Sequence, residues 1–468
     1  MSRLVAPAGD KRFLITEYGS GKSALQVGDT EVYEPVNINS QVAVRPTQSR
    51  IHLLDPDQAV TSLDIQPGNQ ISYFTVKNNG DNVMTDLLLN FTKPARAADD
   101  GRPVEGWGLL HVEKIVFRAN NRVVQTVFWS EIYDWVMTRL DQNKYASVAG
   151  MMGIGLSESE RDAQNLRTRN FTIPLMLFFS SMRGDDLALT LTEDEYDVRV
   201  HWNPPSYFQQ NVIGNDTTSA YTLTNISLVQ RSALTSAQSH QDRMEKIYSS
   251  GLAIPKVHTR RVTEDLAQSE TGKAIADSQK VQLTNLPNGN NCFHMTVRGF
   301  WASNVRYNTN GVDGLYQNPS NAVPLILQLL RNGSDIVETK DTRIHDENGI
   351  YSLHHALELD EAFPTAQAGE WAYVARFFFA HPRLIRLIPT KGRLGGAVID
   401  NRKWSLRVCF NPSTAVGAAG TEAALSQCAA ADSPTGAAVD VPILEIMVYS
   451  YDFVLQTPRQ LKADIDDQ

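Results

Sequence analysis

The chain has 468 residues, of which 42% are hydrophobic, 8% aromatic and 20% charged. This composition excludes disorder, collagen and coiled coil as the main structural class. At roughly 100–200 residues per domain, the length predicts two or three domains whose cores need neither disulfides nor metal. The 52 Asp and Glu residues outnumber the 43 Lys and Arg residues, and the net charge of -9 argues against direct nucleic-acid binding.

The cysteines and the apolar runs indicate in which cellular compartment the protein is expected. Cys292, Cys409 and Cys428 are too few and too far apart for a disulfide framework or a metal site, so we expect free thiols in a reducing compartment. The N-terminus lacks the apolar stretch of a signal peptide. The run Ile173–Phe179, interrupted by Pro174, is far shorter than the roughly 20 residues that cross a bilayer. A soluble protein is expected.

Short runs rich in Val, Ile, Phe, Tyr and Thr, separated by Asn, Gly, Pro and Asp, predict an all-β protein. Alternation is clearest from Val198 to Trp202 and from Phe293 to Val297, where one face of each strand should be buried. In chain order, the other expected strands are Ser72–Lys77, Asp86–Phe91, His111–Phe117, Arg122–Val127, Tyr221–Val229, Leu325–Leu330, Tyr373–Phe379, Leu406–Phe410 and Ile443–Leu455.

Two helices are expected. The first runs from Ser130, a candidate N-cap, to Asp141, with apolar residues at helical spacing. The second spans Thr235 to Tyr248. Because Pro255 and a polar stretch up to Gln279 follow it, this region is interpreted as a connector between domains.

Five short segments recur in the same order in the two halves of the chain. They are Phe74–Lys77 with Met295–Arg298, Arg118–Thr126 with Arg331–Thr339, Ile132–Tyr133 with Ile350–Tyr351, Phe178–Phe179 with Phe378–Phe379, and Val198–Pro204 with Leu406–Pro412. Their collinearity predicts one fold in both halves, although two unrelated β domains remain an alternative. About eight strands per half fit a closed sandwich of the jelly-roll type.

Two segments carry a family resemblance. Phe171–Trp202 places an Ile-Pro-Leu strand, an aromatic pair, a polar turn and a Tyr-x-Val-x-Val strand in sequence. Leu109–Leu140 reads as a strand, a turn, a strand and a Trp-containing helix, and Lys144–Gly150 follows it. These patterns resemble the double jelly-roll major capsid proteins of large nucleocytoplasmic DNA viruses, and a virophage-like lineage stays open.

The resemblance implies a mechanical function without catalysis, cofactor or metal. Three chains would form a homotrimeric capsomer with a six-sided outline, and capsomers would tile an icosahedral shell. The implied partners are copies of the chain, neighbouring capsomers, and minor capsid and penton proteins. An internal membrane would lie nearby without insertion. The implied location is the virion, after assembly in the host cytoplasm.

The predicted domain boundaries are an N-terminal arm at 1–46, a first jelly roll at 47–235, a connector at 236–277, a second jelly roll at 278–459 and a tail at 460–468. The arm is expected either to extend beneath the first sandwich toward neighbouring chains or to be a solvated tail. Three long loops are expected at Asn203–Ala220, Ala302–Ala322 and Asn411–Asp440. By resemblance, the last forms an outward tower; a disordered surface loop is the alternative.

Several short patterns in the sequence resemble enzyme motifs. Gly19–Ser23 lacks the first glycine of a phosphate loop, and the histidines near Glu358 (His345, His354 and His355) lack metal-site spacing. The acidic groups Asp185–Asp186 and Glu193–Glu195 fit a solvated face better than a glycosidase pair. Five Asn-x-Ser/Thr sequons occur, at Asn90, Asn170, Asn215, Asn225 and Asn332. The alternative function is a carbohydrate-binding or hydrolytic protein built on paired jelly rolls.

Overall fold

The computed structural model describes residues 46–463 with internal gaps. The gaps are 64–69, 77, 79–80, 97–101, 104–105, 140–141, 181–187, 193–194, 206–207, 211–220, 266–278, 283–290, 302–323, 333–334, 342–373, 380–396, 399–403, 411–441 and 459. The predicted arm, most of the three long loops, and the Gly19–Ser23 and His345–Glu358 patterns therefore lie outside the described residues.

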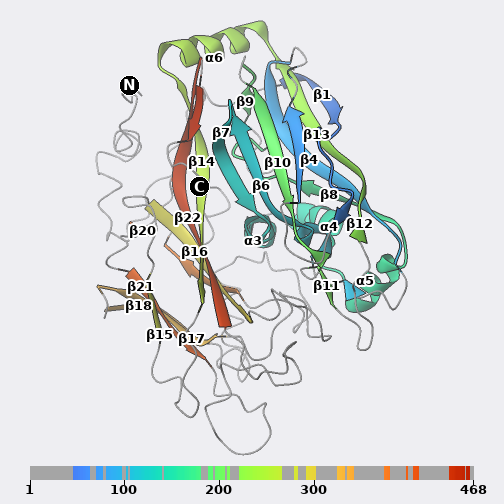
Figure 1. The fold of residues 1–468 in the computed structure, drawn as a ribbon. Coiled ribbons are helices and arrows are strands. Elements are labelled where there is room, and N and C mark those ends of the chain that lie inside the picture. Colours follow the sequence, from blue (N-terminus) through green and yellow to red (C-terminus); the bar gives the residue numbers. More distant parts are fainter. Residues whose placement is uncertain are drawn as a thin grey trace, which may run out of the picture.

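The first half is a sandwich of two antiparallel sheets (Figure 1). One sheet has the order β1-β13-β4-β8, with the short β9 beside β4. Its strands are β1 (Pro46–Leu54), β13 (Thr224–Thr235), β4 (Val83–Lys93), β8 (Arg169–Pro174) and β9 (Leu189–Thr190). The facing sheet has the order β3-β10-β6-β7, from β3 (Ile71–Val76), β10 (Tyr196–Trp202), β6 (Val112–Ala119) and β7 (Arg122–Phe128).

The second half repeats this arrangement. Its larger sheet has the order β14-β22-β16-β19, with β20 beside β16 and β23 beside β22. The strands are β14 (Leu252–Asp265), β22 (Pro442–Thr457), β16 (Asn291–Trp301), β19 (Val374–Phe378), β20 (Ala397–Val398) and β23 (Gln460–Ala463). The facing sheet is β15-β21-β17-β18, from β15 (Gln279–Gln282), β21 (Trp404–Phe410), β17 (Pro324–Arg331) and β18 (Asp335–Asp341).

Numbered one to eight along the chain, the principal strands of either half form one sheet in the order 1-8-3-6 and another in the order 2-7-4-5. The interleaving brings strands that are distant in sequence into one sheet, as in a jelly roll. The predicted all-β fold with two tandem eight-stranded sandwiches is confirmed.

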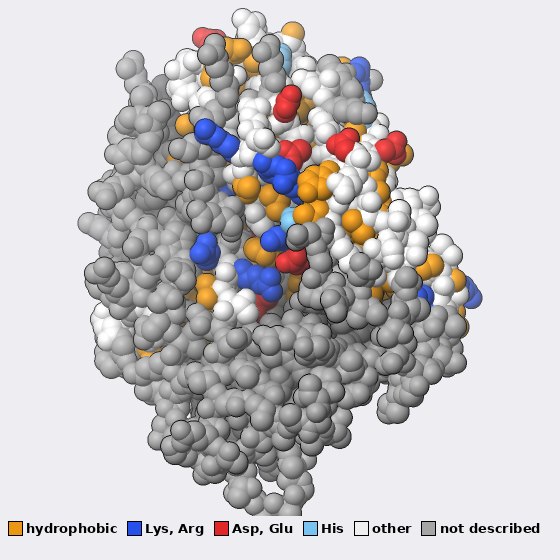
Figure 2. Space-filling model, viewed as in Figure 1, with side chains coloured by type: hydrophobic (Ala, Val, Ile, Leu, Met, Phe, Trp, Pro, Cys, Tyr) orange, Lys and Arg blue, Asp and Glu red, His pale blue; other side chains and the backbone are white. Residues whose placement is uncertain are grey.

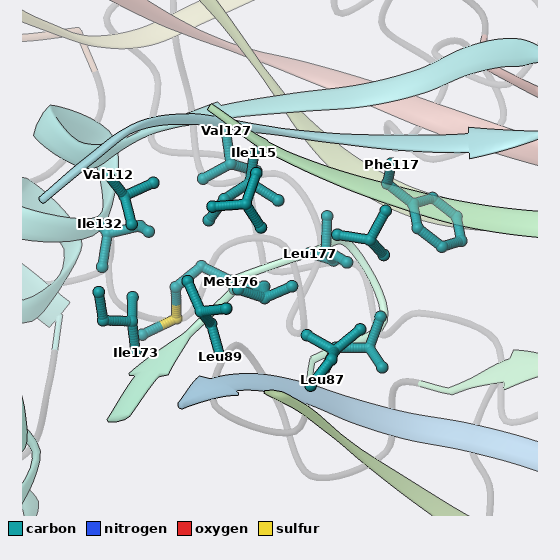
Figure 3. Packing of buried hydrophobic residues seen from close by; sticks show 14 of the residues in the cluster. Leu87, Leu89, Val112, Ile115, Phe117, Val127, Ile132, Ile173, Met176 and Leu177 are labelled. Atoms are coloured by element: carbon teal, nitrogen blue, oxygen red, sulfur yellow. The ribbon is translucent and has the colours of Figure 1, made fainter. Parts of the chain in front are cut away.

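The core of the first half lies between its two sheets. In Figure 3, Leu87 and Leu89 of β4 point toward Ile115 and Phe117 of β6. Strand β10 alternates as predicted. Every second side chain from Tyr196 to Trp202 is buried, and the side chains between them are half-buried. The aligned sheets thus bury one face of each strand, which is the main source of their stability.

Helices fill the connections. They are α2 (Trp107–Leu110), α3 (Trp129–Arg139), α4 (Gln142–Met152), α5 (Glu158–Asn165) and α6 (Ala237–Ser249). Ser236 caps α6 by accepting a hydrogen bond from the Ser239 N–H, close to the predicted start. Helix α3 begins at Trp129, so Ser130 lies inside its first turn and the predicted N-cap is wrong. No helix in the described ranges is long and apolar enough to cross a membrane.

Four short strands complete the loop end of the first half. Strand β2 (Ser62–Leu63) pairs with β12 (Tyr221–Thr222), and β5 (Arg102–Pro103) pairs with β11 (Gln209–Gln210). Strand β11 lies within the predicted loop Asn203–Ala220. Its pairing with β5 fixes this part of the loop to the connection between β4 and β6.

The connector prediction is right for its helix and wrong for the residues that follow. The expected helix is present as α6 (Ala237–Ser249), but Leu252–Asp265 form β14, which pairs with β22 along its full length and belongs to the second sandwich. Pro255 is tolerated because β14 lies at the edge of its sheet, where one side of the backbone has no partner strand. The predicted tail is also partly structured, since Gln460–Ala463 pair with β22 as β23.

The repeat pairs fare differently. The hairpin Arg118–Thr126 does correspond to Arg331–Thr339, because β6-β7 and β17-β18 hold the same place in their sheets. Val198–Pro204 and Leu406–Pro412 begin in β10 and β21, which are also equivalent. Phe378 is the last residue of β19, whereas Phe178 lies four residues beyond the end of the equivalent strand β8, so this pair matches only approximately.

One repeat pair is wrong. Phe74 lies in β3, the second strand of its half, whereas Met295 lies in β16, the third strand of the other half. Short apolar runs recur by chance in any β protein, so the similarity of these two segments does not indicate equivalent strands. Ile350 and Tyr351 lie outside the described residues, which leaves their pair with Ile132 and Tyr133 a prediction.

Candidate functional site: the half-to-half interface and the loop end

The described residues contain no group of three or more His, Cys, Asp or Glu side chains placed to hold a metal ion. Of the acidic residues weighed as a catalytic pair, Glu195 is described and exposed. Its backbone N–H donates to Asn120 Oδ1 at 3.0 Å, and its carbonyl accepts from the Asn120 N–H at 2.8 Å. Both contacts tie the β6–β7 turn to the start of β10, so this part of the acidic segment is structural.

A buried polar interface joins the two halves. Strand β14 supplies Lys256, whose Nζ donates to the Val124 carbonyl of β7 at 3.0 Å. The same Nζ lies 3.5 Å from Asp452 Oδ2 on β22, and both side chains are fully buried. Because β7 is the last strand of its sheet, Lys256 binds a carbonyl of the strand that borders the other half. The buried ammonium of Lys256 therefore depends on a carboxylate of its own half and on a carbonyl of the first half.

Near α6 the contact is made by neutral and cationic donors. Gln456 Nε2 of β22 donates to the Thr190 carbonyl of β9 at 2.6 Å. Arg243 of α6 donates from Nε to Thr190 Oγ1 at 2.8 Å and from Nη2 to the Ala188 carbonyl at 3.2 Å. Burial lowers the pKa of Arg243 to about 10, so the guanidinium remains charged at neutral pH. Helix α6 thereby holds β9 against the second half.

At the α3 end, side chains from both halves interdigitate. His294 Nδ1 of β16 lies 3.6 Å from Asp134 Oδ2 of α3, with both side chains buried. The His294 ring stacks on Tyr449 of β22, with centroids 5.0 Å apart. Ser130 Oγ of α3 donates to Met447 Sδ at 3.8 Å. Helix α3 thus docks onto the sheet of the other half.

This docking corrects a second expectation. Alternation from Phe293 to Val297 predicted one buried face, yet every residue of that run is buried. His294 and Thr296 face out of the second sandwich by their spacing, yet both are buried, and His294 lies against Asp134 of the first half. The same holds from Glu445 to Ser450 in β22. The two sandwiches are therefore held side by side by side chains of β16 and β22 that pack against the first half.

The opposite edge of the first sandwich is exposed. Strand β1 pairs with β13 and forms the outer edge of its sheet. Arg50 and His52 point inward and contact the buried carboxylate of Asp81, at 3.2 and 2.6 Å. Ile51 and Leu53, on the other face, are 69% and 64% exposed. Figure 2 shows hydrophobic side chains interspersed with basic and acidic ones on the described surface of the first half.

The loop end of the first sandwich contains a buried aromatic cluster. His111 stacks on Phe208 with centroids 3.8 Å apart, and its Nε2 lies 3.3 Å from the Tyr221 hydroxyl. Its Nδ1 lies 2.6 Å from the Trp107 carbonyl, which fixes the proton on Nδ1 since a carbonyl can only accept. Two connections, the one from β4 to β6 and the one from β10 to β13, therefore meet around one imidazole.

His111 should make folding sensitive to acid. Burial, together with the nearby charge of Lys93, lowers its pKa to about 3. In the unfolded chain this histidine has a pKa near 6.5, so between pH 6.5 and 3 the unfolded state binds more protons than the folded state. Lowering the pH through this range therefore stabilises the unfolded state relative to the folded state. The free energy of unfolding should fall by up to about 1.4 kcal/mol per pH unit across this window from this group alone. In His111→Phe, urea titrations at pH 7 and 4.5 should give a smaller difference; an unchanged pH dependence would refute the assignment.

No family model and no curated protein sequence matches the chain. Solved structures do match. The structure of PBCV-1 VP54, fitted into a reconstruction of the virophage Sputnik, has a TM-score of 0.60 at 12% identity and covers 90% of this chain and 98% of that one. The fold is the double jelly roll.

Two further double jelly rolls extend the comparison. The Faustovirus major capsid protein has a TM-score of 0.58 at 9% identity, with 90% of this chain and 92% of that chain covered. A chain of the Sputnik virophage has a TM-score of 0.52 at 11% identity, with 92% and 91% covered. At these identities the likeness extends to the fold, and the expected double jelly roll is confirmed.

Sequence reasoning missed the interface residues of this double jelly roll. Lys256 fell in the predicted connector, although the β-branched residues from Ile254 to Thr263 were a visible strand signal. Helix α5 was also missed, although Ser157 and Glu160 form a capping box that the sequence displays. Of the sequons, Asn332 is exposed at the β17–β18 turn and Asn215 lies outside the described residues.

Proposed function

We propose that the chain is a major capsid protein, three copies of which form a capsomer with a six-sided outline that tiles an icosahedral shell. The observation that carries the proposal is the strand-for-strand equivalence of the two halves. A threefold axis acting on a chain with two similar sandwiches arranges six similar units around one centre. Such a unit can present nearly equivalent sides to six neighbours.

The buried interface supports the same proposal. A shell subunit must hold its two sandwiches at one angle, because a small rotation at each subunit would accumulate across a lattice. The contacts of Lys256, His294 and Gln456 with the first half resist such a rotation. Among the structures with the same fold are the PBCV-1 virus capsid and the Faustovirus major capsid protein.

The proposed partners follow from this function. They are copies of the chain within and between capsomers, and minor capsid and penton proteins at the shell's inner face and vertices. We place the protein in the virion after assembly in the host cytoplasm, near an internal membrane without insertion. Direct contact with nucleic acid is disfavoured by the net charge of -9.

Size-exclusion chromatography with light scattering tests the proposal directly. The purified chain should run as a trimer, and electron microscopy should reveal six-sided particles of one size. Ile51→Asp with Leu53→Asp should weaken association if the exposed β1 face lies between chains, whereas Tyr248→Asp on α6, at a side chain 66% exposed, is the matched control. A monomer at all concentrations would contradict the proposal.

The alternative, a carbohydrate-binding or hydrolytic protein, makes a different prediction. Such a protein groups aromatic side chains and carboxylates in an open cleft. In the described part of the chain, the aromatic cluster around His111 is buried, and the carboxylates of Asp134, Asp452 and Glu445 are buried as well. Binding of a monomer to a glycan array would favour this alternative.

A further inference from the structure

Two basic residues lie directly opposite each other at the loop end of the first sandwich. Strands β4 and β8 are antiparallel, and their register pairs Lys93 with Arg169. Like charges in this position repel each other and destabilise a strand pair. The cost is raised here because Lys93 is fully buried. The arrangement therefore requires a compensating interaction.

The observed partners of both side chains are neutral. Lys93 Nζ donates to the Asn165 carbonyl at 2.5 Å and to Asn165 Oδ1 at 3.3 Å. Arg169 Nη2 donates to the Gly150 carbonyl at 2.7 Å. Among the described residues, no carboxylate pairs with either side chain. The positive charges are thus solvated by backbone and amide oxygens without being neutralised.

Both cations also converge on Trp107. Lys93 Nζ lies 5.1 Å from its ring centroid, and the guanidinium carbon of Arg169 lies 5.6 Å from it. Trp107 is fully buried, and its Nε1–H has no acceptor among the described residues. Arg169 Nη1 is a second buried donor without an acceptor there. A buried N–H left unbonded costs about 1–3 kcal/mol, and two of them beside two cations point to an acceptor that carries negative charge.

We propose that Lys93, Arg169 and Trp107 form a binding site for a small inorganic anion, of the halide or oxyanion class. The anion would accept the indole N–H and the free guanidinium N–H, and its charge would offset the repulsion between the opposed cations. We assign the small-ion class because Lys93 and Trp107 are fully buried and Arg169 is half-buried, so the site is an interior one. The site would tie β4, β8 and α2 together.

The acid–base state of Lys93 agrees with this geometry. Burial, followed by the charges of Arg96 and Arg169, lowers its pKa to about 7. A bound anion would favour the ammonium form and counteract this shift. Of the groups around it, His111 has its own pKa lowered to about 3, so it stays neutral near pH 7 and adds no competing charge.

Thermal unfolding of the full chain tests the proposal, in concentration series of sodium bromide and of sodium sulfate. The wild-type Tm should rise saturably by roughly 2–4 °C, as expected when a ligand binds the folded state alone. Lys93→Met should lose this response, and in buffer without these anions it should unfold at a higher temperature than wild type because the repulsion is gone. Equal responses in both proteins would mean a general salt effect or an adventitious ion only, and would overturn the site.

A second measurement stands if Lys93→Met fails to fold. Crystals of the wild-type chain soaked in sodium bromide should give an anomalous peak within hydrogen-bond distance of Trp107 Nε1 and Arg169 Nη1. Arg169→Gln, which keeps a polar side chain at a half-buried position, should lose that peak. A peak that persists in Arg169→Gln, or the absence of any peak in the wild type, would reject the proposal.

Discussion

Lys256→Ala should destabilise the protein by about 3–5 kcal/mol, because it leaves the buried Asp452 carboxylate without its neighbouring cation. The substitution also removes the hydrogen bond from Nζ to the Val124 carbonyl of the first half. Denaturant titration measures the loss as a lower midpoint. We further expect the two halves to unfold in separate steps, since this contact couples them.

The matched control replaces both charges. Lys256→Met combined with Asp452→Leu keeps most of the buried volume and leaves no uncompensated charge, so most of the lost stability should return. A double variant as unstable as Lys256→Ala would show that packing, and not the charge, explains the loss. A single variant within about 0.5 kcal/mol of wild type would contradict the assignment of this pair as a buried contact.

Gly108→Ala should cost about 3 kcal/mol or leave the chain insoluble. A Cβ at this position in α2 would lie 2.4 Å from Phe171 Cδ1 and 2.5 Å from the Met152 carbonyl oxygen. One obstacle is backbone, so a rotamer change cannot relieve the overlap, and the core around Phe171 must shift. The midpoint of urea unfolding, or the soluble yield, provides the measurement.

Gly150→Ala is the control, in α4, the helix whose Met152 carbonyl opposes Gly108. A Cβ there meets nothing within 4 Å, and the residue lies inside α4. Alanine should therefore stabilise the helix by about 0.5–1 kcal/mol. Opposite signs for the two glycines would support the close approach of α2 to β8; a stable Gly108→Ala variant would refute it.

The strands were predictable where one face met the core and the other met water. Tyr196 to Trp202 is such a case, and both the strand and its buried face follow from the alternation. The turn at Asn120 and Asn121 also follows, because both residues adopt the left-handed conformation that asparagine tolerates. These signals are local, so one sequence is enough to read them.

The interface between the halves was not predictable in this way. His294 and Lys256 resemble solvent-facing residues in the sequence, and only the second sandwich packed on the first explains their burial. The opposed pair of Lys93 and Arg169 depends on the register of strands separated by some 75 residues, which no local pattern fixes. The contacts that could not be predicted are those that form only when the whole chain is folded.

The position of β22 has a consequence for biosynthesis. Residues 46–235 contain every strand of the first sandwich, so that sandwich can close while the ribosome is still translating the rest. The second sandwich must wait, because β22 lies between β14 and β16 and is among the last strands to be made. Until then the nascent chain presents unpaired sheet edges, a state prone to misassembly and suited to chaperone binding.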